Sequence, residues 1–120
     1  MTAGELALQI STRKAELDRL RPLTPHALKN LEHIYDLELT YSSNAIEGNA
    51  LSPAETALVV EQGIAIGGKP LRDHLEAIYH FEAIRSVRDL ASRSTVMSEM
   101  DIRSLHSLVV RRSNPDIAER

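Results

Sequence analysis

The chain has 120 residues, of which 42% are hydrophobic, 26% are charged and 3% are aromatic, and its formal net charge is −3. So few aromatic residues argue against a β-sandwich and against a stacking platform for single-stranded nucleic acid. The acidic balance lacks the basic surplus that binds a phosphate backbone, so no nucleic-acid partner is expected. The sequence contains no cysteine, which excludes disulfides and thiolate metal sites.

Neither a membrane span nor a targeting segment is expected. No apolar run approaches the ~20 residues of a transmembrane helix, and residues 1–20 carry charges throughout, unlike a signal peptide. A chain of this length can form a core of its own. We therefore expect a cytoplasmic helical protein that makes no membrane contact.

Apolar residues recur with helical spacing from the beginning of the chain. The first helix is predicted over residues 5–20, and it ends before Pro22. Its apolar stripe consists of Leu6, Ile10, Leu17 and Leu20. A second helix is predicted to begin after Thr24, with Pro25 in its first position, and to run for about twenty residues to a C-cap at Gly48.

Further helices follow, each opened by a local start signal. Ser52 and Glu55 have the spacing of a capping box, and the helix that they begin ends at glycines 67–68. Ser98 caps a later helix, and residues 116–120 begin a sixth. The helix between them begins at Pro70, and its apolar residues predict that it is largely buried: Leu71, Leu75, Ile78, Ala83, Ile84, Val87 and Leu90. No segment alternates with the period of a strand, so the predicted fold class is an all-α helical bundle.

One segment resembles a phosphate-binding loop. Residues 63–69 fit G-x-x-x-x-G-K, but Pro70 stands where a Ser or Thr would hold magnesium. The preceding segment is predicted to be a helix, whereas a phosphate loop follows a strand. We therefore interpret these residues as a connection between helices, with glycine supplying left-handed backbone.

The other candidate groups give no catalytic or metal site. The histidines do not form H-E-x-x-H, so no metal ligands are assigned: His26, His33, His74 and His80. Glu32, Asp36 and Glu38 flank an apolar stripe and are interpreted as a solvated edge rather than an acid–base pair. Ser104 and His106 fall on different helix faces, and no G-x-S-x-G elbow accompanies them, so no nucleophile is expected.

Glu47 is the most informative single residue. It lies four positions after Ser43, hence on the same helix face, and it directly precedes Gly48. The carbonyl end of a helix disfavours an anion by ~0.3–1 kcal/mol, and no basic residue lies at helical pairing distance. From the residues alone two interpretations stay open, an exposed Glu that costs a few tenths of a kcal/mol and a Glu that meets an external partner.

Ser43–Gly48 resembles the inhibitory motif [ST]-x-x-x-E-[GN] of the Fic family (filamentation induced by cyclic AMP). Two later strings, Gly63–Ile84 and Leu105–Arg120, resemble parts of the same domain in the same order. The resemblance extends from Leu37 to the C-terminus. It implies the front half of a Fic-type fold, and an intact domain that transfers AMP from ATP, with magnesium, to a hydroxyl group of a target protein.

The family's catalytic signature, H-x-F-x-[DE]-G-N-[GK]-R, is absent from this sequence. His80 and Phe81 are adjacent and no Gly-Asn follows them, so they do not match it. The resemblance therefore assigns no catalytic residue, no metal ligand and no cofactor to this chain. ATP and magnesium are implied only for the intact family domain.

The matched motif implies a role for three residues. Glu47 would pair with the last Arg of the catalytic signature and occupy the space of the ATP γ-phosphate, with Ser43 and Gly48 as the other inhibitory-motif residues. The Arg must come from another polypeptide or from sequence outside this chain. We expect one helical domain or domain fragment over residues 1–120: N-terminal helices (1–36), an inhibitory helix (37–49) and early Fic-core helices (50–120).

Three functions stay open. The favoured one is the N-terminal autoinhibitory part of a Fic adenylyltransferase, because the chain carries core helices besides the inhibitory helix. The first alternative is a stand-alone, antitoxin-like binding module that acts in trans on a Fic catalytic partner, and the second is a helical bundle without function. The expected partner is the catalytic half of a Fic domain, or a second copy of this chain, since an uncovered apolar face favours self-association.

Overall fold

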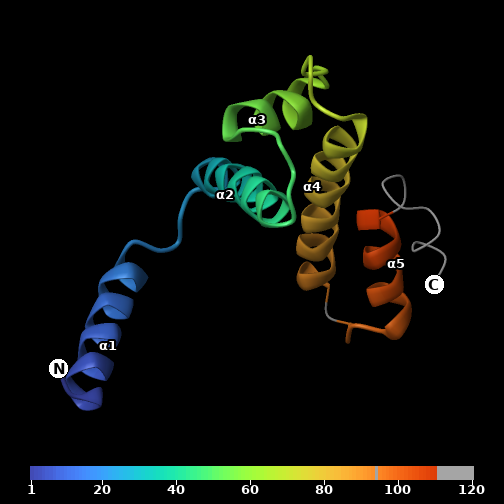
Figure 1. The fold of residues 1–120 in the computed structure, drawn as a ribbon. Coiled ribbons are helices and arrows are strands. Elements are labelled where there is room, and N and C mark those ends of the chain that lie inside the picture. The colour runs from blue at the N-terminus through green and yellow to red at the C-terminus, as the bar shows by residue number, and fades with distance from the viewer. Residues whose placement is uncertain (94, 111–120) are drawn as a thin grey trace. The chain divides into compact units, whose positions relative to one another are not determined.

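A computed structural model describes residues 1–93 and 95–110, and in these ranges it contains α-helices and no strand, which confirms the all-α prediction. The helices in chain order are α1 (Ala3–Arg19), α2 (Pro25–Ile46), α3 (Pro53–Gln62), α4 (Leu71–Ser92) and α5 (Glu99–Val110) (Figure 1). The predicted sixth helix at residues 116–120 lies outside the described residues. No helix in the described ranges is both long and apolar enough to cross a bilayer.

Local signals place most of the helix ends where the sequence predicts them, but α3 ends at Gln62 rather than at the predicted glycines 67–68, because Gly63 already supplies the left-handed C-cap. Thr24 Oγ1 accepts a hydrogen bond from the backbone of Ala27 at 3.1 Å. The capping box before α3 is complete, because Glu55 N donates to Ser52 Oγ at 3.1 Å and Ser52 N donates to Glu55 Oε1 at 2.9 Å. Gly63 ends α3 with a left-handed φ of 65°, a conformation that side chains with a Cβ atom rarely adopt.

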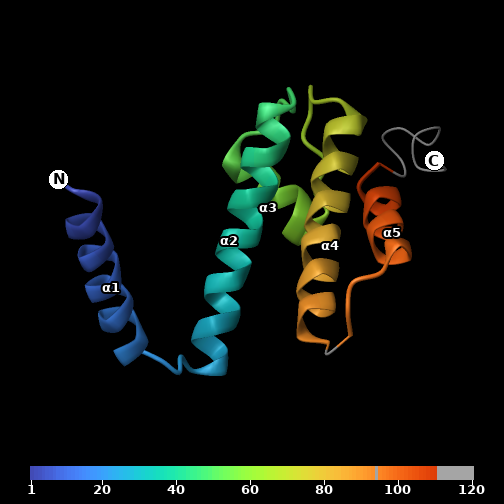
Figure 2. The ribbon, with the colours of Figure 1, turned by 90° about the horizontal axis from the view of Figure 1, so that it is seen from below.

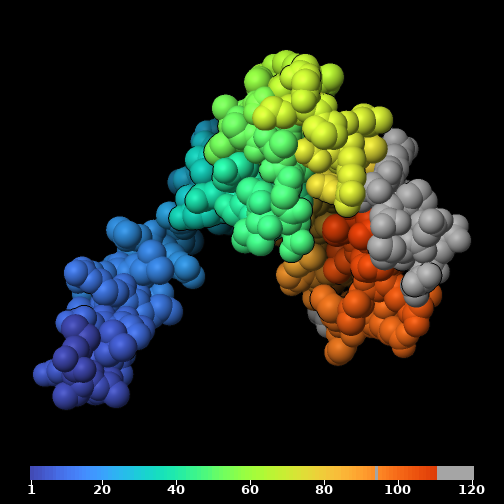
Figure 3. Space-filling model, in the orientation of Figure 1, coloured from blue at the N-terminus to red at the C-terminus, as the bar shows by residue number. Residues whose placement is uncertain are grey.

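The chain divides into two compact units, residues 1–32 and residues 33 onward. In the first unit, α1 has no buried residue, and its apolar stripe of Leu6, Ile10, Leu17 and Leu20 is exposed. In the second unit, α4 contacts both α3 and α5. Figure 2 shows α2 and α4 running in opposite directions. The end of α2, α3 and the beginning of α4 form one continuous surface (Figure 3).

α4 buries polar residues that apolar spacing does not predict, and four of its predicted apolar residues are only half-buried: Leu75, Ile78, Ile84 and Leu90. Its buried residues are Asp73, His74, Ala77, Tyr79, Phe81 and Ala83, so of the seven predicted apolar positions only Ala83 is fully buried. Leu71, at the start of the predicted stripe, is 73% exposed. The apolar period fails here because Asp73 and His74 are buried with hydrogen-bond partners, which removes most of the cost of burying polar groups.

Candidate functional site

The site that the resemblance assigns lies at the C-terminal end of α2. The helix ends at Ile46, and Gly48 follows with a φ of 94°, which supports a glycine C-cap. Ser43 is half-buried, whereas Glu47 and Gly48 are exposed. Within residues 1–93 and 95–110, the Glu47 carboxylate makes no hydrogen bond and no ion pair. Its backbone N–H donates to Asn44 O at 3.1 Å, so the side chain extends from an ordered turn.

Two polar residues of α2 hold this helix against α4. Asp36 and Thr40 are the buried residues of α2. The Asp36 carboxylate, 7% exposed, pairs with Arg88 through Nη2 at 2.6 Å and through Nε at 3.1 Å and 3.2 Å. Thr40 is fully buried, and its Oγ1 lies 3.3 Å from His80 Nδ1. The interpretation of Asp36 as part of a solvated edge is therefore wrong, because Arg88 compensates the carboxylate in a buried position.

The spacing of these residues aligns them with Glu47. Asp36, Thr40, Ser43 and Glu47 are four, three and four positions apart, which places them on one face of a helix. The sequence already contained this signal, a polar stripe on a helix whose other faces carry leucines, but apolar periodicity alone could not reveal it. Asp36 and Thr40 on this face have partners in α4, whereas Glu47 has none among the described residues.

The contact between Thr40 and His80 is expected to depend on pH. Burial lowers the pKa of His80 below 6.5, because the imidazolium loses hydration. The unfolded chain therefore binds this proton more tightly, and the free energy of unfolding should fall as the pH drops below 6.5 until the folded-state pKa is passed. We expect His80→Gln to reduce the loss of stability between about pH 7.5 and about pH 5.5 in urea unfolding, and His106→Gln, an exposed control, to retain it. The same loss in all three proteins would contradict this assignment.

Two other histidines, His74 and His33, have hydrogen-bond partners. His74 Nε2 accepts a hydrogen bond from Ile66 N at 2.8 Å, so its Nδ1 carries the proton and donates to Pro70 O at 2.8 Å. His33 Nε2 lies 2.6 Å from Glu61 Oε1. No group of three metal-binding side chains occurs in the described part of the chain.

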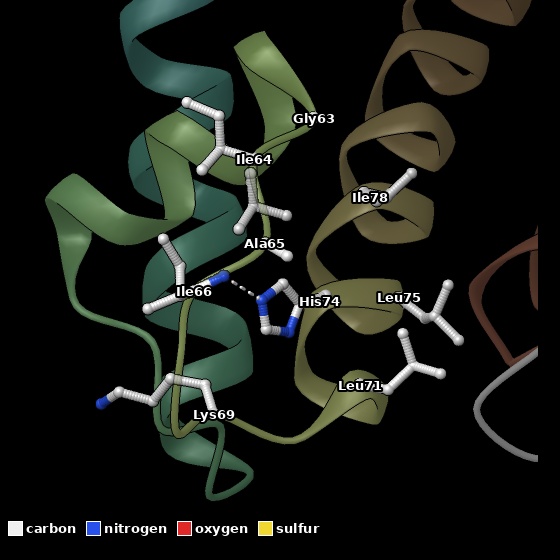
Figure 4. Close-up of a pocket in the computed structure, with 10 residues that line it drawn as sticks. Gly63, Ile64, Ala65, Ile66, Lys69, Leu71, His74, Leu75 and Ile78 are labelled. Atoms are coloured by element: carbon white, nitrogen blue, oxygen red, sulfur yellow. Dashed lines mark hydrogen bonds between the residues drawn. The ribbon is translucent and has the colours of Figure 1, made fainter.

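The segment that resembles a phosphate loop joins α3 to α4, as the sequence predicts. Beside it, a cavity of about 320 Å³ has mostly apolar walls (Figure 4). Lys69 extends away from His74 in this view, and its Nζ donates to Ala50 O at 2.7 Å and lies 3.6 Å from Glu55 Oε1. The amine is therefore engaged by the connection between α2 and α3 rather than presented to a phosphate.

That connection is fixed by hydrogen bonds to the first turns of α4. Asp73 Oδ2 accepts from Ala50 N at 2.8 Å, and Asp73 O accepts from Asn49 Nδ2 at 3.0 Å. By contrast, Asn44 Nδ2 is buried without an acceptor among the described residues, so it does not anchor the end of α2. None of these anchoring residues could be predicted from the sequence, because each contact joins positions more than twenty residues apart.

Known proteins resemble this chain in sequence and in fold. No protein-family model matches the sequence. The chain is 32% identical over 114 residues to the protein adenylyltransferase fic-1 of Caenorhabditis briggsae, an alignment that covers 82% of this chain and 22% of the relative. It is 34% identical over 76 residues to the protein adenylyltransferase Fic of Nematostella vectensis, covering 62% of this chain and 18% of the relative. The chain thus spans about a fifth of the length of these curated relatives.

The fold is also that of a solved relative. The crystal structure of a Fic domain containing signaling protein from Bacteroides thetaiotaomicron matches with a TM-score of 0.76 and 29% identity, over 83% of this chain and 38% of that chain. Sequence similarity to Fic adenylyltransferases and structural similarity to a Fic domain protein therefore agree with the resemblance of residues 43–48, and this chain belongs to the Fic family.

Proposed function

We propose that this chain is the autoinhibitory part of a Fic protein adenylyltransferase, and that Glu47 is its inhibitory group. In this proposal, the carboxylate pairs with the last Arg of the catalytic signature and occupies the space that the γ-phosphate of ATP needs. The chain itself contains no catalytic signature, so AMP transfer belongs to the polypeptide that supplies it. ATP and magnesium would bind that polypeptide.

The observation that supports this proposal most directly is the exposed carboxylate of Glu47, which is unpaired among the described residues and directly follows a helix whose buried acid is paired. Asp36 is neutralised by Arg88 on the same face of α2, whereas Glu47 is exposed and has no partner in the described ranges. A guanidinium from outside would make a bidentate, charge-assisted pair with it, an interaction that competes well with a phosphate oxygen. The same cation would also relieve the repulsion between Glu47 and the carbonyl end of α2.

The neighbouring motif residues support this arrangement in different ways. Gly48 has a φ of 94°, so a side chain with a Cβ atom there would strain the turn that follows Glu47. Ser43 is half-buried one helical turn before Glu47, where we propose that it helps to fix the inhibitory helix.

Titration of the chain into a catalytic Fic polypeptide that lacks its own inhibitory Glu tests this proposal. We expect the transfer of labelled AMP from ATP to a protein substrate to fall as the 120-residue chain is added. Glu38→Ala is the matched control for replacement of Glu47, since Glu38 is an exposed acid on α2. This variant should inhibit like the wild-type chain. Undiminished AMP transfer at saturating wild-type chain would exclude the inhibitory role in trans.

A further inference from the structure

Asp73, an acid of α4, forms hydrogen bonds with residues that follow the end of α2. Asp73 is 8% exposed, and burying a carboxylate is costly unless hydrogen bonds compensate it. Its Oδ2 accepts from Ala50 N at 2.8 Å, and its backbone oxygen accepts from Asn49 Nδ2 at 3.0 Å. One residue of α4 therefore binds two consecutive residues of the connection that follows Glu47.

Asn49 connects this anchored segment to α2. Its backbone N–H donates to Asn44 O at 3.0 Å, inside the last turn of α2. Its side chain donates to Glu76 Oε2 at 3.1 Å as well as to Asp73, and its Oδ1 accepts from Leu51 N at 3.0 Å. Asn49 thus links the last turn of α2 to α4, and Glu47 lies between Asn44 and Asn49 in this link.

We infer that Asp73 is a positioning residue for Glu47: its carboxylate holds the backbone of Ala50 and its backbone oxygen holds the Asn49 side chain, and these bonds determine where the Glu47 carboxylate is presented. This inference rests on the proposed function. Asp73 does not contact Glu47, and its effect acts through the two residues that it binds. The position of the inhibitory group would then depend on the beginning of α4 as well as on α2.

An acid in the first turn of a helix has an ordinary role that must be separated from this one. Asp73 lies close to the N-terminal end of α4, where a negative charge is stabilised by the helix dipole. If this were its whole contribution, the loss of the carboxylate would loosen α4 and leave residues 47–50 unaffected. Amide hydrogen exchange resolved by residue distinguishes the two roles.

The first test measures amide exchange on the full chain for wild type, Asp73→Ala, Asp73→Asn and Glu82→Ala, an exposed control on α4. For Asp73→Ala we expect exchange of the Ala50 N–H to accelerate by about tenfold, because its acceptor Oδ2 is lost. Exchange at Gly48 and Asn49 should accelerate less, because their N–H groups keep Ala45 O and Asn44 O as acceptors. Asp73→Asn keeps an amide oxygen that can accept from Ala50 N, so it should restore most of the protection. Acceleration confined to the first turn of α4, with residues 48–50 unchanged, would overturn the inference.

The second test repeats the titration into the catalytic polypeptide. Asp73→Ala should raise the concentration that half-inhibits AMP transfer by about tenfold, Asp73→Asn should not, and neither should have an effect when Glu47 is already replaced by glycine. If the wild-type chain does not inhibit, the inhibitory role in trans fails, while amide exchange still decides the role of Asp73. If the wild-type chain inhibits and Asp73→Ala inhibits equally, the positioning role is refuted.

Discussion

Replacing Glu47 with glycine is expected to raise AMP transfer by roughly 10- to 100-fold in a Fic adenylyltransferase inhibited by this chain, because charge-assisted hydrogen bonds contribute about 1.5–3 kcal/mol. The variant removes the carboxylate that is proposed to hold the catalytic Arg. Glu47→Gln should give an intermediate rate, since an amide oxygen can still accept from a guanidinium but carries no charge. Rates of AMP transfer from labelled ATP, measured at one chain concentration, compare the three proteins.

A comparison of ATP with ADP tests whether Glu47 acts by excluding the γ-phosphate. If the carboxylate occupies the space of the γ-phosphate, Glu47→Gly should tighten the binding of ATP and leave the binding of ADP unchanged. Calorimetric titration of the inhibited complex with each nucleotide measures both affinities, with Glu38→Ala as the control. Equal gains for ATP and ADP would show that Glu47 restrains the enzyme in some way other than by excluding the γ-phosphate.

Arg88→Ala should lower the free energy of unfolding by about 2–3 kcal/mol, because it leaves the Asp36 carboxylate buried without its counter-ion. The reverse variant, Asp36→Ala, should cost less. The Arg88 side chain is 43% exposed, so its guanidinium can turn to water when the acid is removed, whereas Asp36 at 7% exposed cannot. Urea unfolding of the two variants measures this asymmetry.

A double variant separates pairing from packing. Asp36→Leu combined with Arg88→Met removes both charges and retains apolar volume, and such replacements of buried ion pairs are often neutral or stabilising. We expect the double variant to be more stable than Arg88→Ala. A double variant as unstable as Arg88→Ala would show that the unpaired buried charge is not the source of the lost stability.

The helices could be predicted from the sequence because their ends depend on neighbouring residues. Thr24, Ser52 and Ser98 each bond to a backbone N–H three positions later, which a short stretch of sequence reveals. The position of Glu47 just before a glycine cap was predictable for the same reason, and its assigned role came from the resemblance of residues 43–48 to a known motif.

The contacts between helices could not be predicted in this way. Asp36 and Arg88 are 52 positions apart, and nothing local to either residue indicates its partner. Apolar periodicity missed part of what α4 buries because it treats every polar residue as exposed, whereas Asp73 and His74 are buried with hydrogen-bond partners. Leu71 is exposed although it begins the predicted stripe.

The polar character of the residues that α2 buries also restricts how that helix can slide. A displacement of one helical turn, ~5.4 Å, would exchange one leucine for another in an apolar interface at little cost. Here the same displacement would break the pairing of Asp36 and the contact of Thr40 together. These two polar contacts therefore favour the observed register of α2, the helix that precedes Glu47, on α4.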